Sequence, residues 1–111
     1  MQYRRLGKSG LQLSALSFGA WVTFGKQVDR TQARELLALA HARGVNFFDN
    51  AEIYNHGVAE EVMGDVLADL RFPRDSYCVS SKVFFGSATN PLPTQRGLSR
   101  KHVIEACHQA M

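Results

Sequence analysis

The sequence predicts an α/β fold in which parallel strands alternate with helices. Two kinds of segment follow one another three times after an N-terminal hairpin: short apolar runs, and longer stretches whose apolar residues recur with the spacing of a helix. The chain has 111 residues, of which 45% are hydrophobic and 21% charged, which is the size of one small domain and the composition of a globular protein. We therefore expect residues 1–111 to belong to a single domain.

The first elements are a hairpin and a strand. Residues 3–6 and 11–13 carry apolar side chains and flank the sequence Gly-Lys-Ser-Gly, whose two glycines suit a tight turn. The apolar run at 15–21 follows directly and is expected to form the first strand of the parallel sheet.

A helix is predicted after Asp29, which can accept a hydrogen bond at the helix start, with Gln32 at the capping-box position. Gly44 can adopt the left-handed conformation that ends it. The face expected to be buried consists of Ala33, Leu36, Leu37 and Ala40.

A second strand–helix unit is predicted at 45–48 and 58–70, and a third strand at 76–81. Gly64 inside the helix costs about 1 kcal/mol relative to alanine, which suggests close packing against a neighbour. The face expected to be buried consists of Val58, Val62, Val66 and Leu70.

The third helix is predicted to follow a long loop that contains Asn-Pro and further proline, and to begin at Ser99. Its expected apolar side consists of Val103, Ile104, Cys107 and Ala110. The helix pattern runs to Met111 without a closing turn. We therefore expect the helix to continue, and these residues to be the N-terminal portion of a larger domain.

Charge and cysteine content exclude several classes. The net charge of +3 comes from scattered Lys and Arg without an RNA-binding aromatic motif or a basic helix, so no nucleic-acid partner is expected. Cys78 and Cys107 show no metal-ligand spacing and are expected to be small buried residues in a reducing compartment, with no metal bound. The N-terminus lacks the apolar core of a signal peptide and no apolar run reaches 18 residues, which predicts a cytoplasmic protein without membrane insertion.

Polar or aromatic residues stand where the three predicted strands end: Trp21, Asp49 and Lys82. In parallel sheets, whether open or closed into a barrel, functional sites lie at the carboxyl ends of the strands. The three residues are therefore expected to share one site.

The sequence also resembles a known family. The stretches "GVNFFDNAEIYNHGVAEEVMG" at 44–64 and "SSKV" at 80–83 are similar to the aldo-keto reductases, and "WVTFGKQV" at 21–28 resembles the branch that includes the potassium-channel β-subunits. The resemblance covers essentially the whole chain. It implies a (β/α)8 TIM barrel of which this chain provides the hairpin and about three strand–helix units.

The resemblance also implies a function, the reduction of aldehydes and ketones by NADPH, and a catalytic tetrad of Asp, Tyr, Lys and His. Asp49, Tyr54 and Lys82 match three members, whereas the family's histidine follows a fourth strand that this chain does not reach. The residues implied to contact the cofactor are Ala20, Trp21, Gln27 and Asp49. A homo-oligomer is compatible with it, and a channel-β-like interaction protein or an inactive fragment remain alternative readings.

The chemistry explains why these residue types belong together. A carbonyl that receives a hydride needs a proton on its oxygen, and a tyrosine hydroxyl can supply it as a general acid. Lowering a tyrosine pKa of about 10 by about 2 units requires roughly 3 kcal/mol. One ammonium about 4 Å away provides about 4 kcal/mol at an effective dielectric constant of about 20. Lys82 is thus sufficient, and Asp49 would keep a buried lysine charged.

Structural roles remain open for each residue alone. Asp49 could bind loop amides, Tyr54 could fill a loop, and Lys82 could be a surface lysine. Trp21 could belong to the core instead of walling a pocket. Four further residues have two readings each: His56 as mouth or surface residue, Phe84 and Phe85 as pocket border or loop packing, and Gln27 as cofactor contact or solvated residue. Glu60 and Glu61 are expected to favour the helix dipole.

Overall fold

The computed structural model describes residues 1–21, 23–24 and 27–111; Val22, Gly25 and Lys26, in the stretch that resembles the channel branch, lie outside the described residues. The chain begins with the predicted hairpin, in which β1 (Tyr3–Arg5) pairs antiparallel with β2 (Gln12–Ser14). The hairpin is joined to the rest of the chain by the Tyr3 hydroxyl, which donates to the carbonyl of Gly44 at 2.9 Å.

A parallel sheet of three strands follows, in the order β3–β4–β5, as the alternating pattern predicts. The strands are β3 (Phe18–Gly19), β4 (Phe47–Asp49) and β5 (Cys78–Ser80). Phe48 lies opposite both Phe18 and Val79, and Asp49 opposite both Gly19 and Ser80. Each strand is shorter than the apolar run that predicted it, because only part of each run pairs with a neighbouring strand.

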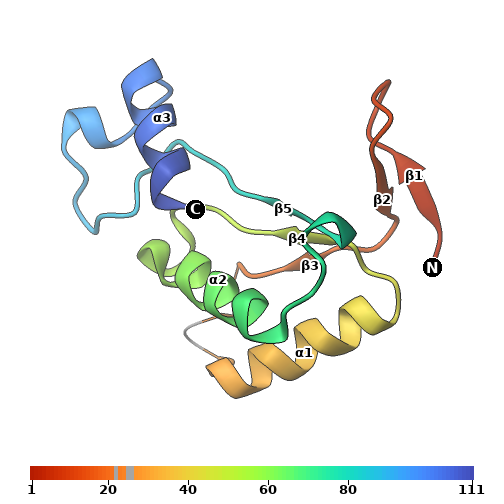
Figure 1. Ribbon diagram of the computed structural model, residues 1–111. Coiled ribbons are helices and arrows are strands. Elements are labelled where there is room, and N and C mark those ends of the chain that lie inside the picture. Colours follow the sequence, from red (N-terminus) through yellow and green to blue (C-terminus); the bar gives the residue numbers. More distant parts are fainter. Residues whose placement is uncertain (22, 25–26) are drawn as a thin grey trace.

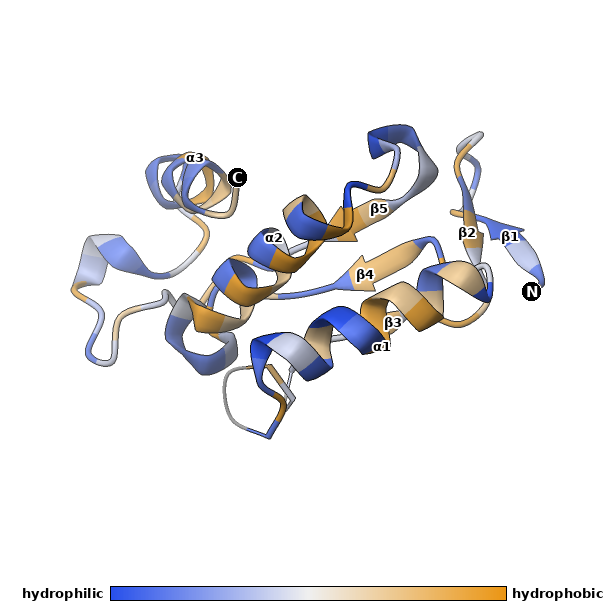
Figure 2. Cartoon of the chain, turned by 60° about the horizontal axis from the view of Figure 1, so that its bottom comes forward, coloured by the Kyte–Doolittle hydropathy of each residue, from blue (hydrophilic) through white to orange (hydrophobic). Residues whose placement is uncertain are grey.

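Two helices cover one face of this sheet, α1 (Arg30–Ala42) and α2 (Val58–Leu70), with their hydrophobic sides turned toward the strands (Figure 2). The predicted cap of α1 is confirmed: the Gln32 N–H donates to Asp29 at 2.8 Å, and Gln32 accepts from the Asp29 N–H. Gly44 has the expected positive φ, of 89°. The fully buried centre of the core includes Phe24, Leu37, Phe48, Met63 and Val66.

The expected buried faces of both helices need correction. In α1 the prediction is confirmed for Ala33 and Leu37, which are buried, and for Ala40, which packs against the core, whereas Leu36 is 39% exposed.

In α2 Val66 is buried as predicted, and the predicted Val62 and Leu70 pack against the core while only partly buried. The other buried residues are Ala59, Met63 and Leu67. The predicted row at every fourth position drifts around the helix, whereas the observed row keeps to one side. Val58 is therefore 38% exposed.

The expected close packing at Gly64 is also wrong. A Cβ added at Gly64 would meet nothing within 4 Å, because the glycine is exposed. In the described part of the chain, no packing contact at Gly64 therefore offsets the cost of a glycine to helix stability.

The third helix, α3 (Arg100–Gln109), begins at the predicted cap, where Ser99 accepts from the His102 N–H at 3.1 Å. It stands apart from the sheet at the far end of a long loop (Figure 1). The predicted apolar side is consequently wrong: Val103 is 40% exposed, and Cys107 is an exposed free thiol. The buried residues of α3 are instead His102 and Ala106. The expectation that both cysteines are buried is therefore wrong, since Cys78 is only half-buried.

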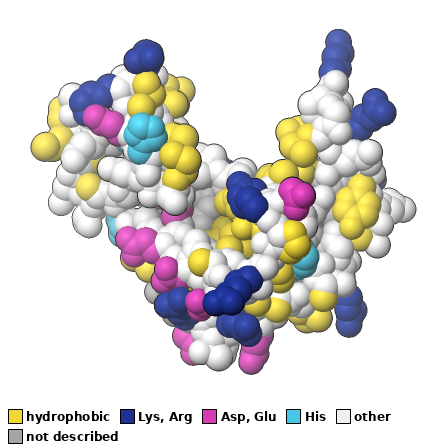
Figure 3. Space-filling model, viewed as in Figure 1, with side chains coloured by type: hydrophobic (Ala, Val, Ile, Leu, Met, Phe, Trp, Pro, Cys, Tyr) yellow, Lys and Arg dark blue, Asp and Glu magenta, His cyan; other side chains and the backbone are white. Residues whose placement is uncertain are grey.

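The sheet is open at both sides in this chain. Its edge strands are β3 and β5, and Val79 on β5 is 43% exposed. The space-filling view shows the molecule hollowed between the arm that carries α3 and the arm formed by the hairpin, with hydrophobic side chains exposed in the hollow (Figure 3). Unpaired edges and exposed apolar surface favour association with other chains.

We expect the isolated 111-residue polypeptide to self-associate or to lack fixed packing, because net stabilities are only about 5–15 kcal/mol even for complete domains. Size-exclusion chromatography with light scattering, together with thermal unfolding followed by near-UV circular dichroism, measures both properties. A monodisperse monomer with one sharp unfolding transition would contradict this expectation.

Candidate active site

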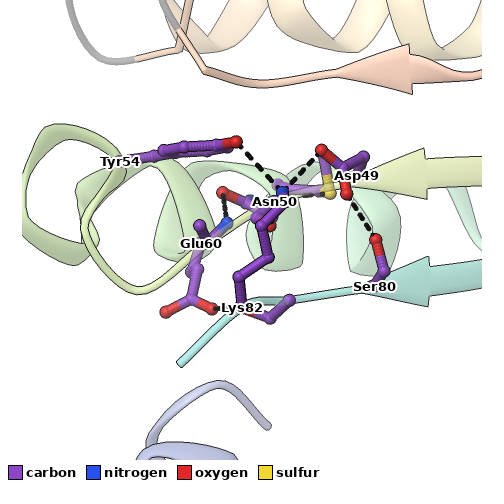
Figure 4. Close-up of polar contacts among 9 residues, drawn as sticks. Asp49, Asn50, Tyr54, Glu60, Ser80 and Lys82 are labelled. Carbon is purple, nitrogen blue, oxygen red and sulfur yellow. Dashed lines mark hydrogen bonds and ion pairs between the residues drawn. The ribbon is translucent and has the colours of Figure 1, made fainter. Parts of the chain in front are cut away.

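Three side chains converge at the carboxyl ends of β4 and β5, and Figure 4 shows them together. The Lys82 ammonium donates to Asp49 Oδ2 at 2.7 Å, to the Asn50 carbonyl at 2.7 Å and to the Tyr54 hydroxyl oxygen at 3.0 Å. An ammonium has three N–H donors, so all three are in use. The tyrosine oxygen accepts from Lys82, and its own proton remains available to another acceptor.

The register of the sheet brings these residues together. Asp49 pairs with Ser80, which places Lys82 two residues beyond the last pair of β5. Tyr54 stands on the short 3-10 turn η1 (Tyr54–Gly57) after β4, and its N–H donates to the Ala51 carbonyl at 3.0 Å. This turn folds the chain back, so that Tyr54 reaches Lys82 although it lies outside the sheet.

Each charge in the pair favours the other. Burial alone would raise the pKa of Asp49, but hydrogen bonds from Lys82 and Ser80 and the Lys82 charge outweigh it, so this pKa lies below the ordinary value of 3.8. Burial alone would lower the pKa of Lys82, but hydrogen bonds to Asp49 and Tyr54 and their charges raise it above 10.5.

The stabilising effect of the pair therefore has two limits. It is lost at acid pH, as the pH falls through the lowered pKa of Asp49, and at alkaline pH, as it rises through the raised pKa of Lys82. The pair is intact at neutral pH. The expectation of a buried lysine is wrong: the Lys82 side chain is 52% exposed, and water screens part of its attraction to Asp49.

Two supporting residues were missed by the sequence analysis. The Ser80 hydroxyl donates to Asp49 Oδ1 at 2.6 Å, so that both carboxylate oxygens are held. Asn50 is 2% exposed; its amide donates to the Ala59 carbonyl at 2.9 Å and fixes the start of α2 beside the site. Their position at the ends of apolar strands is the signal in the sequence that could have predicted both residues.

A cavity of about 420 Å³ lies beside the three residues. Trp21 is 69% exposed and stacks on Tyr54, with 6.2 Å between the ring centroids, so it is a wall residue and not part of the core. Phe84 and Phe85 also border the cavity, which decides between the two readings of this pair. The lining residues are Trp21, Ala51, Glu52, Ile53, Tyr54, Lys82, Phe84 and Phe85.

The other residues implied by the resemblance lie as follows. Ala20 is fully buried, and its N–H donates to the Asp49 carbonyl at 3.0 Å, which ties β3 to β4. Gln27 is exposed in the turn before α1 and does not line the cavity of the described residues. His56 is an exposed residue with a left-handed φ of 55°. Glu60 and Glu61 stand in the first turn of α2, and Glu60 also accepts from the Ser81 hydroxyl.

The donor set suits the reacting end of a nicotinamide cofactor and a carbonyl. The exposed indole of Trp21 and the apolar wall can pack on a flat ring. The Asp49 carboxylate can accept hydrogen bonds, and the Tyr54 hydroxyl can donate or accept one. Lys82 is the one cation among the described lining residues, and it is already engaged by three acceptors. These residues therefore fit the nicotinamide end and not the phosphates.

Comparison with known proteins identifies the family to which this fold belongs. The model of the aldo/keto reductase family matches residues 15–111. Two solved structures of an aldo-keto reductase from Pseudomonas aeruginosa superpose with TM-scores of 0.76 and 0.77 at 30% identity, covering 97% of this chain and 40% and 39% of theirs. The chain belongs to the aldo-keto reductase family, and its open sheet is part of the family's (β/α)8 barrel.

The chain is also similar to two plant proteins named "Probable voltage-gated potassium channel subunit beta", from Arabidopsis thaliana and Oryza sativa subsp. japonica. Each is 52% identical over 105 residues, which is 95% of this chain. The chain spans about a third of the length of these relatives, 31% in both cases. Within the described residues, no helix combines the length and the apolar character needed to span a membrane.

Proposed function

We propose that Asp49, Tyr54 and Lys82 form the acid–base part of an active site that reduces aldehydes or ketones with NADPH. The observation that carries the proposal is the use of all three Lys82 donors, one of them on the Tyr54 oxygen at 3.0 Å. The tyrosine proton is thereby left for a substrate carbonyl, and the adjacent positive charge favours its departure.

The residues divide the work. A nicotinamide bound here would supply the hydride for the carbonyl carbon. Tyr54 gives its proton to the carbonyl oxygen, and Lys82 stabilises the negative charge left on the tyrosine oxygen. Asp49 keeps Lys82 charged and in place through the 2.7 Å contact, while Ser80 holds the second carboxylate oxygen. Trp21 and Phe84 would hold the flat parts of the ligands.

The test uses the complete barrel, meaning residues 1–111 within a chain of the full length of the relatives. Oxidation of NADPH is followed by absorbance with an aldehyde and with a ketone, and NADH is compared at equal concentration. We expect turnover that depends on the carbonyl and is faster with NADPH. The family resemblance implies that residues of the C-terminal part contact its 2′-phosphate. Absence of carbonyl-dependent oxidation with either nucleotide would overturn the proposal.

A second candidate function is a channel-β-like role as a homo-oligomeric interaction partner in the cytoplasm. The 52% identity to the two plant proteins favours it. This role is compatible with carbonyl reduction, because a protein that binds a channel could use the same residues to bind the cofactor. Co-purification of the complete barrel with a voltage-gated potassium channel supports this role. A complete barrel that reduces carbonyls at high rate and retains no channel would argue against it.

A further inference from the structure

A buried contact between a carboxylate and an imidazole lies at the wall of the cavity and takes no part in the proposed proton transfer. Glu52 and His102 are each 5% exposed, and His102 Nε2 is 3.2 Å from Glu52 Oε2. A carboxylate at this depth is costly unless its oxygens are fully engaged.

The main partners of Glu52 are two backbone amides of the loop after β5. Its Oε1 accepts from the Phe84 N–H at 2.6 Å and from the Gly86 N–H at 2.8 Å. The Glu52 backbone N–H in turn donates to the Lys82 carbonyl at 3.2 Å. One residue therefore holds this loop at three points, on both sides of the aromatic pair that borders the cavity.

Two further features restrict the path of this loop. The Phe84 carbonyl accepts from the Gly97 N–H at 2.6 Å. Gly86 has a positive φ of 79°, and a Cβ there would stand 2.3 Å from the Gln95 carbonyl oxygen. The two aromatic rings nevertheless remain exposed, at 50% for Phe84 and 61% for Phe85, so side-chain burial does not hold them in place.

We propose that Glu52 is a positioning residue that sets the substrate-facing aromatic wall, Phe84 and Phe85, by binding the amides of residues 84 and 86. His102 holds the carboxylate from the side of α3. This inference rests on the proposed function for its consequence: the wall determines how well an aromatic carbonyl substrate is held, whereas Tyr54 and Lys82 carry out the proton transfer. Removing Glu52 should therefore weaken substrate binding more than it slows turnover.

The experiment measures KM and kcat of the complete barrel with two probes, benzaldehyde, which can pack on the wall, and propanal, which is too small to use it fully. We expect Glu52→Ala to raise the KM for benzaldehyde about tenfold, with kcat changed less than about threefold and propanal kinetics nearly unchanged. Glu52→Asp keeps the charge but withdraws it from the amides, and it should act in the same direction if the alanine variant does not fold.

Two further variants separate positioning from a general loss of structure. Glu52→Gln keeps an oxygen that can accept from both amides, and should retain a KM within about threefold of the parent. Glu105→Ala is the matched control: its carboxylate is an exposed partner of Lys101 on α3, and its loss should change neither constant.

A double-mutant cycle tests the route of the effect. In a background that carries Phe84→Ala and Phe85→Ala, the Glu52→Ala change should add almost nothing to KM, because the wall it positions is gone. Additive effects, or equal losses with benzaldehyde and propanal, would overturn the proposal.

Hydrogen exchange of the Phe84 and Gly86 amides gives a readout independent of activity. Both should be protected in the parent and lose protection in Glu52→Ala, while the amides of β4 keep theirs. If the parent is inactive but shows this exchange pattern, the proposed function is wrong, whereas the role of Glu52 in positioning the loop is supported. Unchanged exchange at both amides would show that Glu52 does not position the loop.

Discussion

Replacing Tyr54 with phenylalanine in the complete barrel is expected to lower kcat for carbonyl reduction roughly 10²- to 10⁴-fold. The change removes the hydroxyl that donates the proton and leaves the ring that stacks on Trp21. Because Lys82 and Asp49 keep their own 2.7 Å contact, the site should retain its shape. The Kd for NADPH, measured by fluorescence titration, should therefore stay nearly unchanged.

The matched control is Tyr77→Phe, which removes a hydroxyl at the opposite end of β5 from Lys82. The Tyr77 ring packs on Phe48 and Phe72, and these contacts persist without the hydroxyl. Its kcat should remain near the parent value. If Tyr54→Phe keeps a kcat within threefold of the parent, the assignment of Tyr54 as the proton donor fails.

Replacing Lys82 with methionine is expected to abolish most activity. Methionine keeps much of the volume but removes the charge 3.0 Å from the Tyr54 oxygen, and it leaves Asp49 without its counter-ion. The loss of charge should also change the pH dependence of the remaining activity. In the parent the rate should fall at alkaline pH as Lys82, whose pKa is raised above 10.5, loses its proton, and this fall should be absent in Lys82→Met.

This second prediction is measured as pH–rate profiles of kcat/KM for the parent and Lys82→Met. Lys101→Met is the control, because Lys101 is an exposed lysine that pairs with Glu105 one turn along α3. Its profile should match that of the parent. A Lys82→Met variant whose alkaline fall occurs at the same pH as in the parent would reduce Lys82 to a structural role.

The linkage of the ion pair sets the range over which these comparisons are sound. The Asp49–Lys82 contact persists at neutral pH, since one pKa is lowered and the other raised. Measurements between about pH 5 and pH 9 therefore report on the same charge state of the pair. Fully half of the Lys82 side chain is exposed in this chain, so a barrel that covers the site should strengthen the effect of its charge.

The local sequence alone determined the class of fold and the proximity of the site residues. Short apolar runs that alternate with helices are typical of parallel strands, and parallel strands bring their carboxyl ends to one edge. Asp49 and Lys82 follow two such runs directly, so their contact follows from the order of the chain. The Asp29 and Ser99 caps were predictable for the same reason: the groups that form each cap lie within three residues of one another.

The tertiary structure decided which of several apolar rows each helix buries and which polar residues support the site. Val58 and Ala59 both begin a plausible row, and packing on the sheet selects the one with Ala59. Glu52 and His102 are 50 positions apart, and nothing in the sequence shows that the Glu52 carboxylate would contact His102 and accept from the Phe84 and Gly86 amides. Such contacts depend on the path of the loop after β5, which is set by long-range packing and backbone hydrogen bonds and not by any local pattern.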